Sequence, residues 1–129
     1  MSDRFSYSQV PPASQTKAPM LSVTLRSANL SVTELALIDS GSDVTTITEK
    51  VRNRLGLEPK GVTKLSGAIS SDQKKTQLYV ADIEFCGRTY ANRPVYLLEH
   101  KQYMLIGRDI INSRMLSLDG PSEELTVHP

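Results

Sequence analysis

One acidic residue is notable because it lies at the end of an apolar run, directly before a turn. Asp39 follows the apolar run 35–38 and precedes Ser40 and Gly41, in a turn of small and polar residues. Two carboxyl groups held close together share one proton because like charges repel each other. One of them can then take a proton from a water while the other donates to a carbonyl oxygen. Asp39 is therefore a candidate catalytic acid, with a small hydroxyl in Ser40 to hold the turn and a glycine in Gly41 that permits close backbone approach.

The Asp-Ser-Gly segment occurs only once in the 129 residues. A mechanism that needs two such carboxylates must take the second from another molecule, so the sequence predicts a homodimer. Asp119 also precedes a glycine, but it lacks a neighbouring hydroxyl, and Pro121 indicates a simple turn. The alternative for the Asp39 segment is an ordinary surface turn, because Asp, Ser and Gly are common turn residues. The buried strand expected before Asp39 favours a catalytic site over an ordinary surface turn.

The residues around this turn have the pattern of many short strands. Apolar and polar residues alternate over 21–25, and a second expected strand, 30–38, ends in a continuously apolar run, as in a strand covered on both faces. Further strands are expected at 44–47, 62–69, 76–85, 89–98 and 104–106, with a C-terminal hairpin formed by 116–118 and 125–127. This pattern predicts an all-β domain of the closed-barrel or sandwich type.

Only two short helices are expected. The first covers 48–55, where Thr48 could cap its start and Gly56 could end it. The second covers 108–114. Pro94 indicates an edge or a bend in its strand, because proline cannot donate a backbone hydrogen bond.

The composition indicates a single domain and narrows the range of functions. Residues 1–19 are rich in Pro and Ser without an apolar face and are expected to be a flexible leader, whereas 20–129 form the domain. A formal charge of +1 gives no electrostatic reason to expect nucleic acid or an anionic membrane as a partner.

Cys86 is the only cysteine and is interpreted as a small buried or turn residue, with redox control as the alternative. Neither a secretory signal pattern nor a long apolar run is present, so localisation is cytoplasmic or unassigned.

A second motif lies in the last quarter of the sequence. Residues 104–111 read Met-Leu-Ile-Gly-Arg-Asp-Ile-Ile, and Gly107 follows Asp39 by 68 residues. Together with Leu-Ile-Asp-Ser-Gly-Ser-Asp at 37–43, this resembles the retropepsin-like aspartic proteases of retroviruses, retroelements and some cellular genes. The resemblance covers about 21–127. It implies a single-domain, closed β-barrel with one or two short helices that functions as a homodimer.

The resemblance also implies roles for the second motif. Ile106 and Gly107 would belong to a framework behind the catalytic turn, and Arg108 would support that turn by pairing with Asp43. A planar guanidinium can hold a carboxylate through two parallel hydrogen bonds. The alternative for Arg108 is a solvated residue in the first turn of the last helix.

Retropepsins cover their substrate with a hairpin called the flap, and the corresponding segment here includes Gly67, Ala68 and Ile69. These residues would close over a substrate whose backbone contacts Gly41 and Asp43. The segment contains fewer glycines than typical flaps, so an ordinary hairpin is the alternative.

Two positions in the active-site motif also depart from the family. Ser42 stands where alanine is most frequent, and Ser40 replaces the commoner threonine while keeping the hydroxyl that would brace the two turns across the dimer.

The resemblance implies a homodimeric aspartic endopeptidase that cleaves polypeptides, with Asp39 of each subunit activating one water. Such an enzyme needs no metal and no organic cofactor. One alternative is a retropepsin-like module that dimerises and binds peptides without cleaving them. Another is a small β-barrel that binds nucleic acid, which the balanced charge and the few aromatic residues disfavour. No membrane partner is expected.

Overall fold

The computed structural model describes residues 2–11, 16–66, 73–99 and 101–129. Within these ranges the chain forms two short helices, α1 (Glu49–Leu55) and α2 (Arg108–Ile111). The strands are β1 (Asp3–Ser6), β2 (Ser8–Gln9), β3 (Lys17–Ala18), β4 (Met20–Ser27), β5 (Leu30–Ile38), β6 (Thr46–Ile47), β7 (Gly61–Ser66), β8 (Gln73–Phe85), β9 (Arg88–Leu97), β10 (Met104–Ile106), β11 (Leu116–Asp119) and β12 (Glu124–Val127). No described helix has the length and apolar character needed to cross a membrane.

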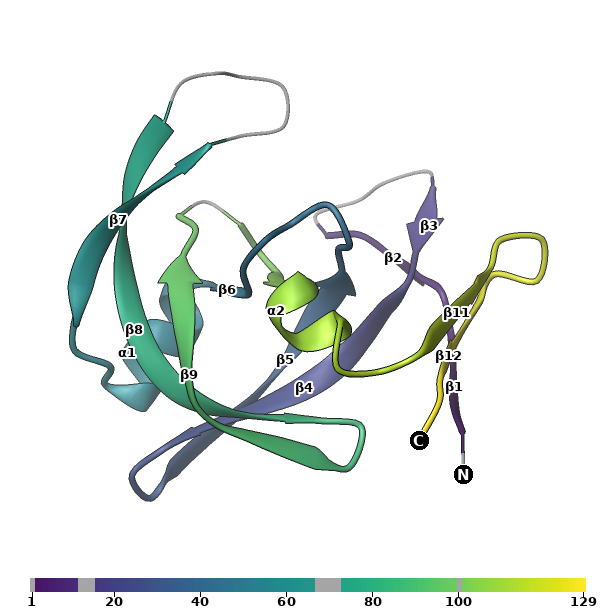
Figure 1. Ribbon diagram of the computed structural model, residues 1–129, viewed down its shortest axis with the longest axis horizontal. Coiled ribbons are helices and arrows are strands. Elements are labelled where there is room, and N and C mark those ends of the chain that lie inside the picture. The colour runs from purple at the N-terminus through teal and green to yellow at the C-terminus, as the bar shows by residue number, and fades with distance from the viewer. Residues whose placement is uncertain (1, 12–15, 67–72, 100) are drawn as a thin grey trace.

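Six strands close into a barrel (Figure 1). They follow the order β4-β5-β10-β6-β9-β8, and β8 closes the ring by pairing again with β4 through Thr24↔Glu84, Leu25↔Ile83 and Arg26↔Asp82. β7 pairs with the outer part of β8 and extends the sheet as a hairpin that rises above the barrel. The prediction of a mostly β, closed barrel with two short helices is confirmed.

The barrel encloses an apolar interior to which each of its six strands contributes buried side chains. In β4, Leu21, Val23 and Leu25 are buried, whereas Ser22 and Arg26 are exposed and Thr24 is half-buried, which is the two-residue period expected of a strand. The largest fully buried side chains are Tyr79, Phe85, Met20, Leu25, Ile47, Ile83, Met104, Ile106, Ile110, Leu125, Val23 and Val51. Met104, Ile106 and Ile110 belong to the second motif, and Ile38 of the first motif is also buried, so both candidate motifs contribute to the core.

Helix α1 begins and ends at the residues that the sequence indicates. The Thr48 hydroxyl accepts a hydrogen bond from the Val51 backbone N–H at 3.3 Å, and Gly56 adopts the left-handed conformation with φ of 60°. Val51 and Leu55 are buried, and the helix packs against β5. The predicted caps are confirmed.

The chain termini form a separate three-stranded sheet in the order β1-β12-β11. The predicted C-terminal hairpin is confirmed, with Leu118 opposite Leu125 and Leu116 opposite Val127. Part of the segment expected to be a flexible leader forms a strand, because β1 pairs with β12 through Phe5 and Leu125. Half-buried Phe5 packs against the core, which gives this short strand an apolar anchor. The division at residues 1–19 and 20–129 stays a prediction.

Several predicted elements are shorter in the structure. The strand expected at 44–47 is regular only over Thr46–Ile47, because Thr45 turns its polar groups toward the second motif. The helix expected at 108–114 ends at Ile111. Near Pro94 the pairing of β8 with β9 shifts register between Ala81 and Ile83, which agrees with the predicted bend.

Candidate active site

The two sequence motifs lie side by side because β10 runs parallel to β5. Met104, Leu105 and Ile106 pair with Ala36, Leu37 and Ile38. The Asp39 backbone N–H then donates to the Ile106 carbonyl at 3.0 Å, so the second motif continues to hold the chain where the candidate acid emerges.

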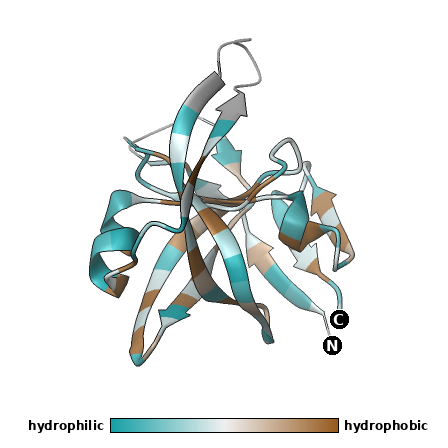
Figure 2. Cartoon of the chain, turned by 60° about the vertical axis from the view of Figure 1, so that its left-hand side comes forward, coloured by the Kyte–Doolittle hydropathy of each residue, from teal (hydrophilic) through white to brown (hydrophobic). Residues whose placement is uncertain are grey.

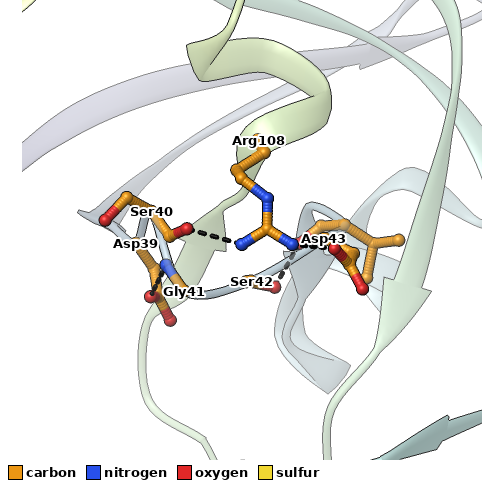
Figure 3. Close-up of polar contacts among 7 residues, drawn as sticks. Asp39, Ser40, Gly41, Ser42, Asp43 and Arg108 are labelled. Carbon is orange, nitrogen blue, oxygen red and sulfur yellow. Dashed lines mark hydrogen bonds and ion pairs between the residues drawn. The ribbon is translucent and has the colours of Figure 1, made fainter.

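The turn after β5 orients the carboxylate of Asp39. The Gly41 N–H donates to Asp39 Oδ1 at 3.0 Å, and the Ser42 N–H donates to the Asp39 carbonyl at 3.1 Å (Figure 3). A Cβ at Gly41 would lie 3.2 Å from Asp39 Oδ1, so glycine at this position leaves room for the carboxylate. Asp39 is half-buried, and Ser40 and Gly41 are exposed. The carboxylate is thus held in one orientation at the edge of the core with solvent access.

Arg108 connects the turn to the start of α2. Its guanidinium donates to the Ser40 carbonyl at 2.6 Å and forms an ion pair with Asp43 through a second nitrogen (Figure 3). Its backbone N–H also donates to the Ser42 carbonyl at 2.8 Å. The expected pairing of Arg108 with Asp43 is present, but the guanidinium bridges two groups instead of holding one carboxylate with two parallel bonds. Arg108 therefore braces both ends of the turn.

The side chain of Ser42 has a structural role. Its hydroxyl donates to the Val44 carbonyl at 2.7 Å. The serine at this position, where alanine is most frequent in the resembled family, adds a hydrogen bond within the loop after Asp39. The departure is thus accommodated in the turn.

Gly107 is fixed by its contact with the same loop. A Cβ at this position would lie 2.3 Å from the Val44 carbonyl oxygen and 2.9 Å from the Ser42 carbonyl oxygen. The Gly107 N–H donates to the Thr45 hydroxyl at 3.2 Å. The packing leaves no space for a side chain.

The contacts by which Asp109 supports the loop are not among the sequence predictions. Its Oδ1 accepts from the hydroxyl of fully buried Thr45 at 2.7 Å, and its Oδ2 accepts from the Thr45 backbone N–H at 3.1 Å. Arg93 donates to the Asp109 carbonyl at 2.7 Å. The position of Asp109 next to Arg108 in the second motif is the only sequence signal that points to this role.

The predicted flap residues and Asp119 lie apart from the loop that follows Asp39 in the sequence. Gly67, Ala68 and Ile69 lie outside the described residues, so only the stem of the predicted flap, β7 with the start of β8, is described. Asp119 is the last residue of β11, and its carboxylate accepts from the N–H of Ser122 in the following turn at 3.1 Å. In the described part of the chain, no group of three or more His, Cys, Asp or Glu residues is arranged to hold a metal ion.

Cys86 occupies the turn between β8 and β9, with a positive φ of 47°. The side chain is half-buried and packs against the core. Burial raises the pKa of the Cys86 thiol above its ordinary value, and Asp3 raises this pKa further, whereas Arg114 opposes the shift. The thiol is therefore protonated at neutral pH. Its place in the turn agrees with the interpretation of Cys86 as a small buried or turn residue.

The fold is that of the retropepsin-like aspartic proteases. Residues 22–110 match the sequence model of the family described as aspartyl protease, and the chain belongs to that family. No curated protein sequence matches the chain.

Solved structures share the fold, among them two proteases and one protease-like domain. A retropepsin-like aspartic protease from Rickettsia conorii has a TM-score of 0.62 at 11% identity, with 98% of this chain and 91% of that chain covered. EIAV protease, complexed with the inhibitor HBY-793, has a TM-score of 0.57 at 22% identity, with 77% and 89% covered. The retroviral protease-like domain of Ddi1 from Leishmania major has a TM-score of 0.52 at 17% identity, with 86% and 90% covered.

Replacing Arg108 with lysine tests the bracing of the turn. Lysine keeps the charge but cannot donate from two separate nitrogens to Ser40 and Asp43, so the variant is expected to lose about 1 kcal/mol in free energy of unfolding. The estimate is kept small because the arginine side chain is 40% exposed. Urea denaturation measures the loss. Arg54→Lys, on the exposed face of α1, is the matched control, and an equal effect in both variants would contradict the bracing role.

Proposed function

We propose that the chain is a homodimeric aspartic endopeptidase in which Asp39 of each subunit forms one half of a catalytic pair. The observation that carries the proposal is the turn that presents the Asp39 carboxylate at the end of a buried strand, held by Gly41 and braced by Arg108. Because the chain contains one such turn, a second copy must supply the other carboxylate.

The reaction uses a proton shared between the two carboxyl groups. The unprotonated carboxylate takes a proton from a water as the water oxygen attacks the peptide carbonyl carbon. The protonated partner gives its proton to the carbonyl oxygen, and a tetrahedral diol forms. When the C–N bond breaks, the carboxyl group that took the proton from water gives it to the departing nitrogen, and the other carboxylate takes a proton from a diol hydroxyl. The products are a carboxylic acid and an amine, and the pair again shares one proton. These steps require neither a metal nor an organic cofactor.

The neighbouring residues have supporting roles in this proposal. The Ser40 hydroxyl braces the two turns across the dimer, and Gly41 and Asp43 contact the backbone of an extended polypeptide substrate. Main-chain hydrogen bonds of this kind hold peptides independently of their sequence. Gly67, Ala68 and Ile69 close over the substrate and exclude water from it. Ile106, Gly107 and Arg108 support the turn from behind.

Cleavage of an unstructured polypeptide tests the activity. The purified protein is incubated with a reduced and alkylated protein over a pH series from acid to neutral, and the products are mapped by mass spectrometry. We expect discrete cleavage sites and a bell-shaped pH dependence, because activity needs one carboxyl protonated and the other not. Sedimentation velocity on the same samples measures the dimer.

The other candidate is a dimeric peptide-binding module without catalysis. It predicts a dimer that binds peptides but produces no fragment at any pH. That result would reject the protease proposal. Fragmentation of the protein's own leader before Leu21 would instead support it and give a first specificity.

A further inference from the structure

The charge of the chain is distributed unevenly, although its total is close to zero. Residues 59–78, which include β7 and the first part of β8, contain four lysines and one aspartate, a net charge of +3. The rest of the chain therefore carries −2, against a total of +1. Positive charge is concentrated on the hairpin that rises above the barrel.

Two of these lysines lie directly opposite each other. In the antiparallel pairing of β7 with β8, Lys64 is the partner of Lys75. Like charges at directly opposed positions destabilise a sheet. Both side chains are exposed, and within the described chain neither forms an ion pair with a carboxylate. The pair is thus not explained by the stability of the hairpin.

The two lysines share a face of the hairpin with residues that lead into the barrel. Alternate residues of a strand lie on one face, so Lys75, Gln77 and Tyr79 point the same way. Tyr79 is only 1% exposed and belongs to the core, and its hydroxyl donates to Gln77 Oε1. The lysine face therefore continues the inner face of the barrel beyond its rim.

This part of the hairpin rises at the end of the barrel where the loop between β5 and β6 lies (Figure 1). That loop contains Asp39. Hydrophilic residues lie on the hairpin just below its grey tip, whereas apolar residues are frequent in the strands beneath (Figure 2). The inner face of the stem is thus both cationic and on the side where a substrate of Asp39 would lie.

We propose that Lys64 and Lys75 form a subsite for acidic side chains of the polypeptide substrate. The inference rests on the proposed function and assigns it a substrate class, namely segments that carry Asp or Glu near the cleaved bond. Both lysines lie in the stem of the hairpin and not at its tip, so they contact substrate residues some positions away from that bond. An acidic substrate side chain between them also removes the repulsion between the two ammonium groups.

The test compares peptides that differ only in flanking charge. A cleavage site mapped in the unstructured protein is synthesised with flanking Glu, Gln or Lys residues, and kcat/KM is measured for each. We expect the Glu peptide to exceed the Lys peptide by about three- to tenfold, since each exposed charge pair contributes a modest free energy. The ratio should fall towards one as salt is added.

The double variant Lys64→Glu/Lys75→Glu should reverse the preference. Arg54→Glu changes one exposed charge on α1, outside the hairpin, and should leave the preference in place. A Glu preference that persists in the double variant, or the absence of any charge preference in the native chain, would overturn the inference while leaving the protease proposal intact.

A binding measurement tests the acidic subsite independently of peptide cleavage. Fluorescence anisotropy with labelled Glu, Gln and Lys peptides is measured on the Asp39→Asn variant, which is expected not to cleave them. If the native chain cleaves nothing but the Glu peptide binds best and depends on the lysines, the proposed function fails and the acidic subsite stands. Tighter, lysine-dependent binding of a single-stranded oligonucleotide than of the Glu peptide would assign the patch to nucleic acid and overturn the inference.

Discussion

The Asp39→Asn variant is expected to lose peptide cleavage by on the order of 10³-fold or more, because an amide can neither take the proton from water nor share one with a partner carboxyl. The fold should be unchanged, since the Asn Oδ1 can still accept the hydrogen bond that the Gly41 N–H donates to Asp39 Oδ1 at 3.0 Å. Product formation by mass spectrometry and the dimer by sedimentation velocity are measured on the same preparation.

Asp119→Asn provides the matched control for this change. Asp119 also precedes a glycine, but it is the last residue of β11, and its Oδ1 accepts a hydrogen bond that an Asn oxygen can also accept. The control should cleave at the native rate. Activity that survives in Asp39→Asn, or that disappears together with its dimer, would contradict the assignment of Asp39 as the catalytic acid.

The Gly107→Ala variant is expected to lose about 3 kcal/mol or more in free energy of unfolding. The added methyl would lie 2.3 Å from the Val44 carbonyl oxygen, well inside contact distance. The backbone cannot move away without cost, because the Gly107 N–H is bonded to Thr45 and the neighbouring Arg108 N–H to the Ser42 carbonyl. Urea denaturation measures the loss, and activity should fall with it.

Gly61→Ala is the control, because a Cβ at the start of β7 meets no heavy atom within 4 Å. Its free energy of unfolding should change by no more than about 0.5 kcal/mol. Equal stability of the two alanine variants would contradict the close contact between Gly107 and the Val44 carbonyl.

Elements with strong local signals could be predicted from the sequence. The strand Leu30–Ile38 has the predicted bounds because an apolar run ends at a polar turn, and α1 has a hydroxyl and a glycine at its two ends. The ion pair of Arg108 with Asp43 was expected from the joint occurrence of two motifs, which is a statement about a family and not about local chemistry.

Features that depend on distant partners could not be predicted. β1 contains a single apolar residue, Phe5, and is a strand only because β12, at the other end of the chain, supplies its hydrogen bonds. The contact of Asp109 with Thr45 joins residues 64 positions apart, and neither residue type indicates a partner. The dimer and the hairpin segment that contains Gly67 stay predictions.

The parallel pairing of β10 with β5 has a consequence for the order in which the protein can mature. During synthesis β5 and the Asp39 turn leave the ribosome well before β10, Gly107 and Arg108, which hold that turn. Contacts across so long a stretch of chain form late, because closing the loop costs conformational entropy before any pairing compensates for it. A nascent chain therefore exposes its aspartate without the strand that positions it. Under the proposed function, peptide cleavage is therefore deferred until almost the whole domain has been made.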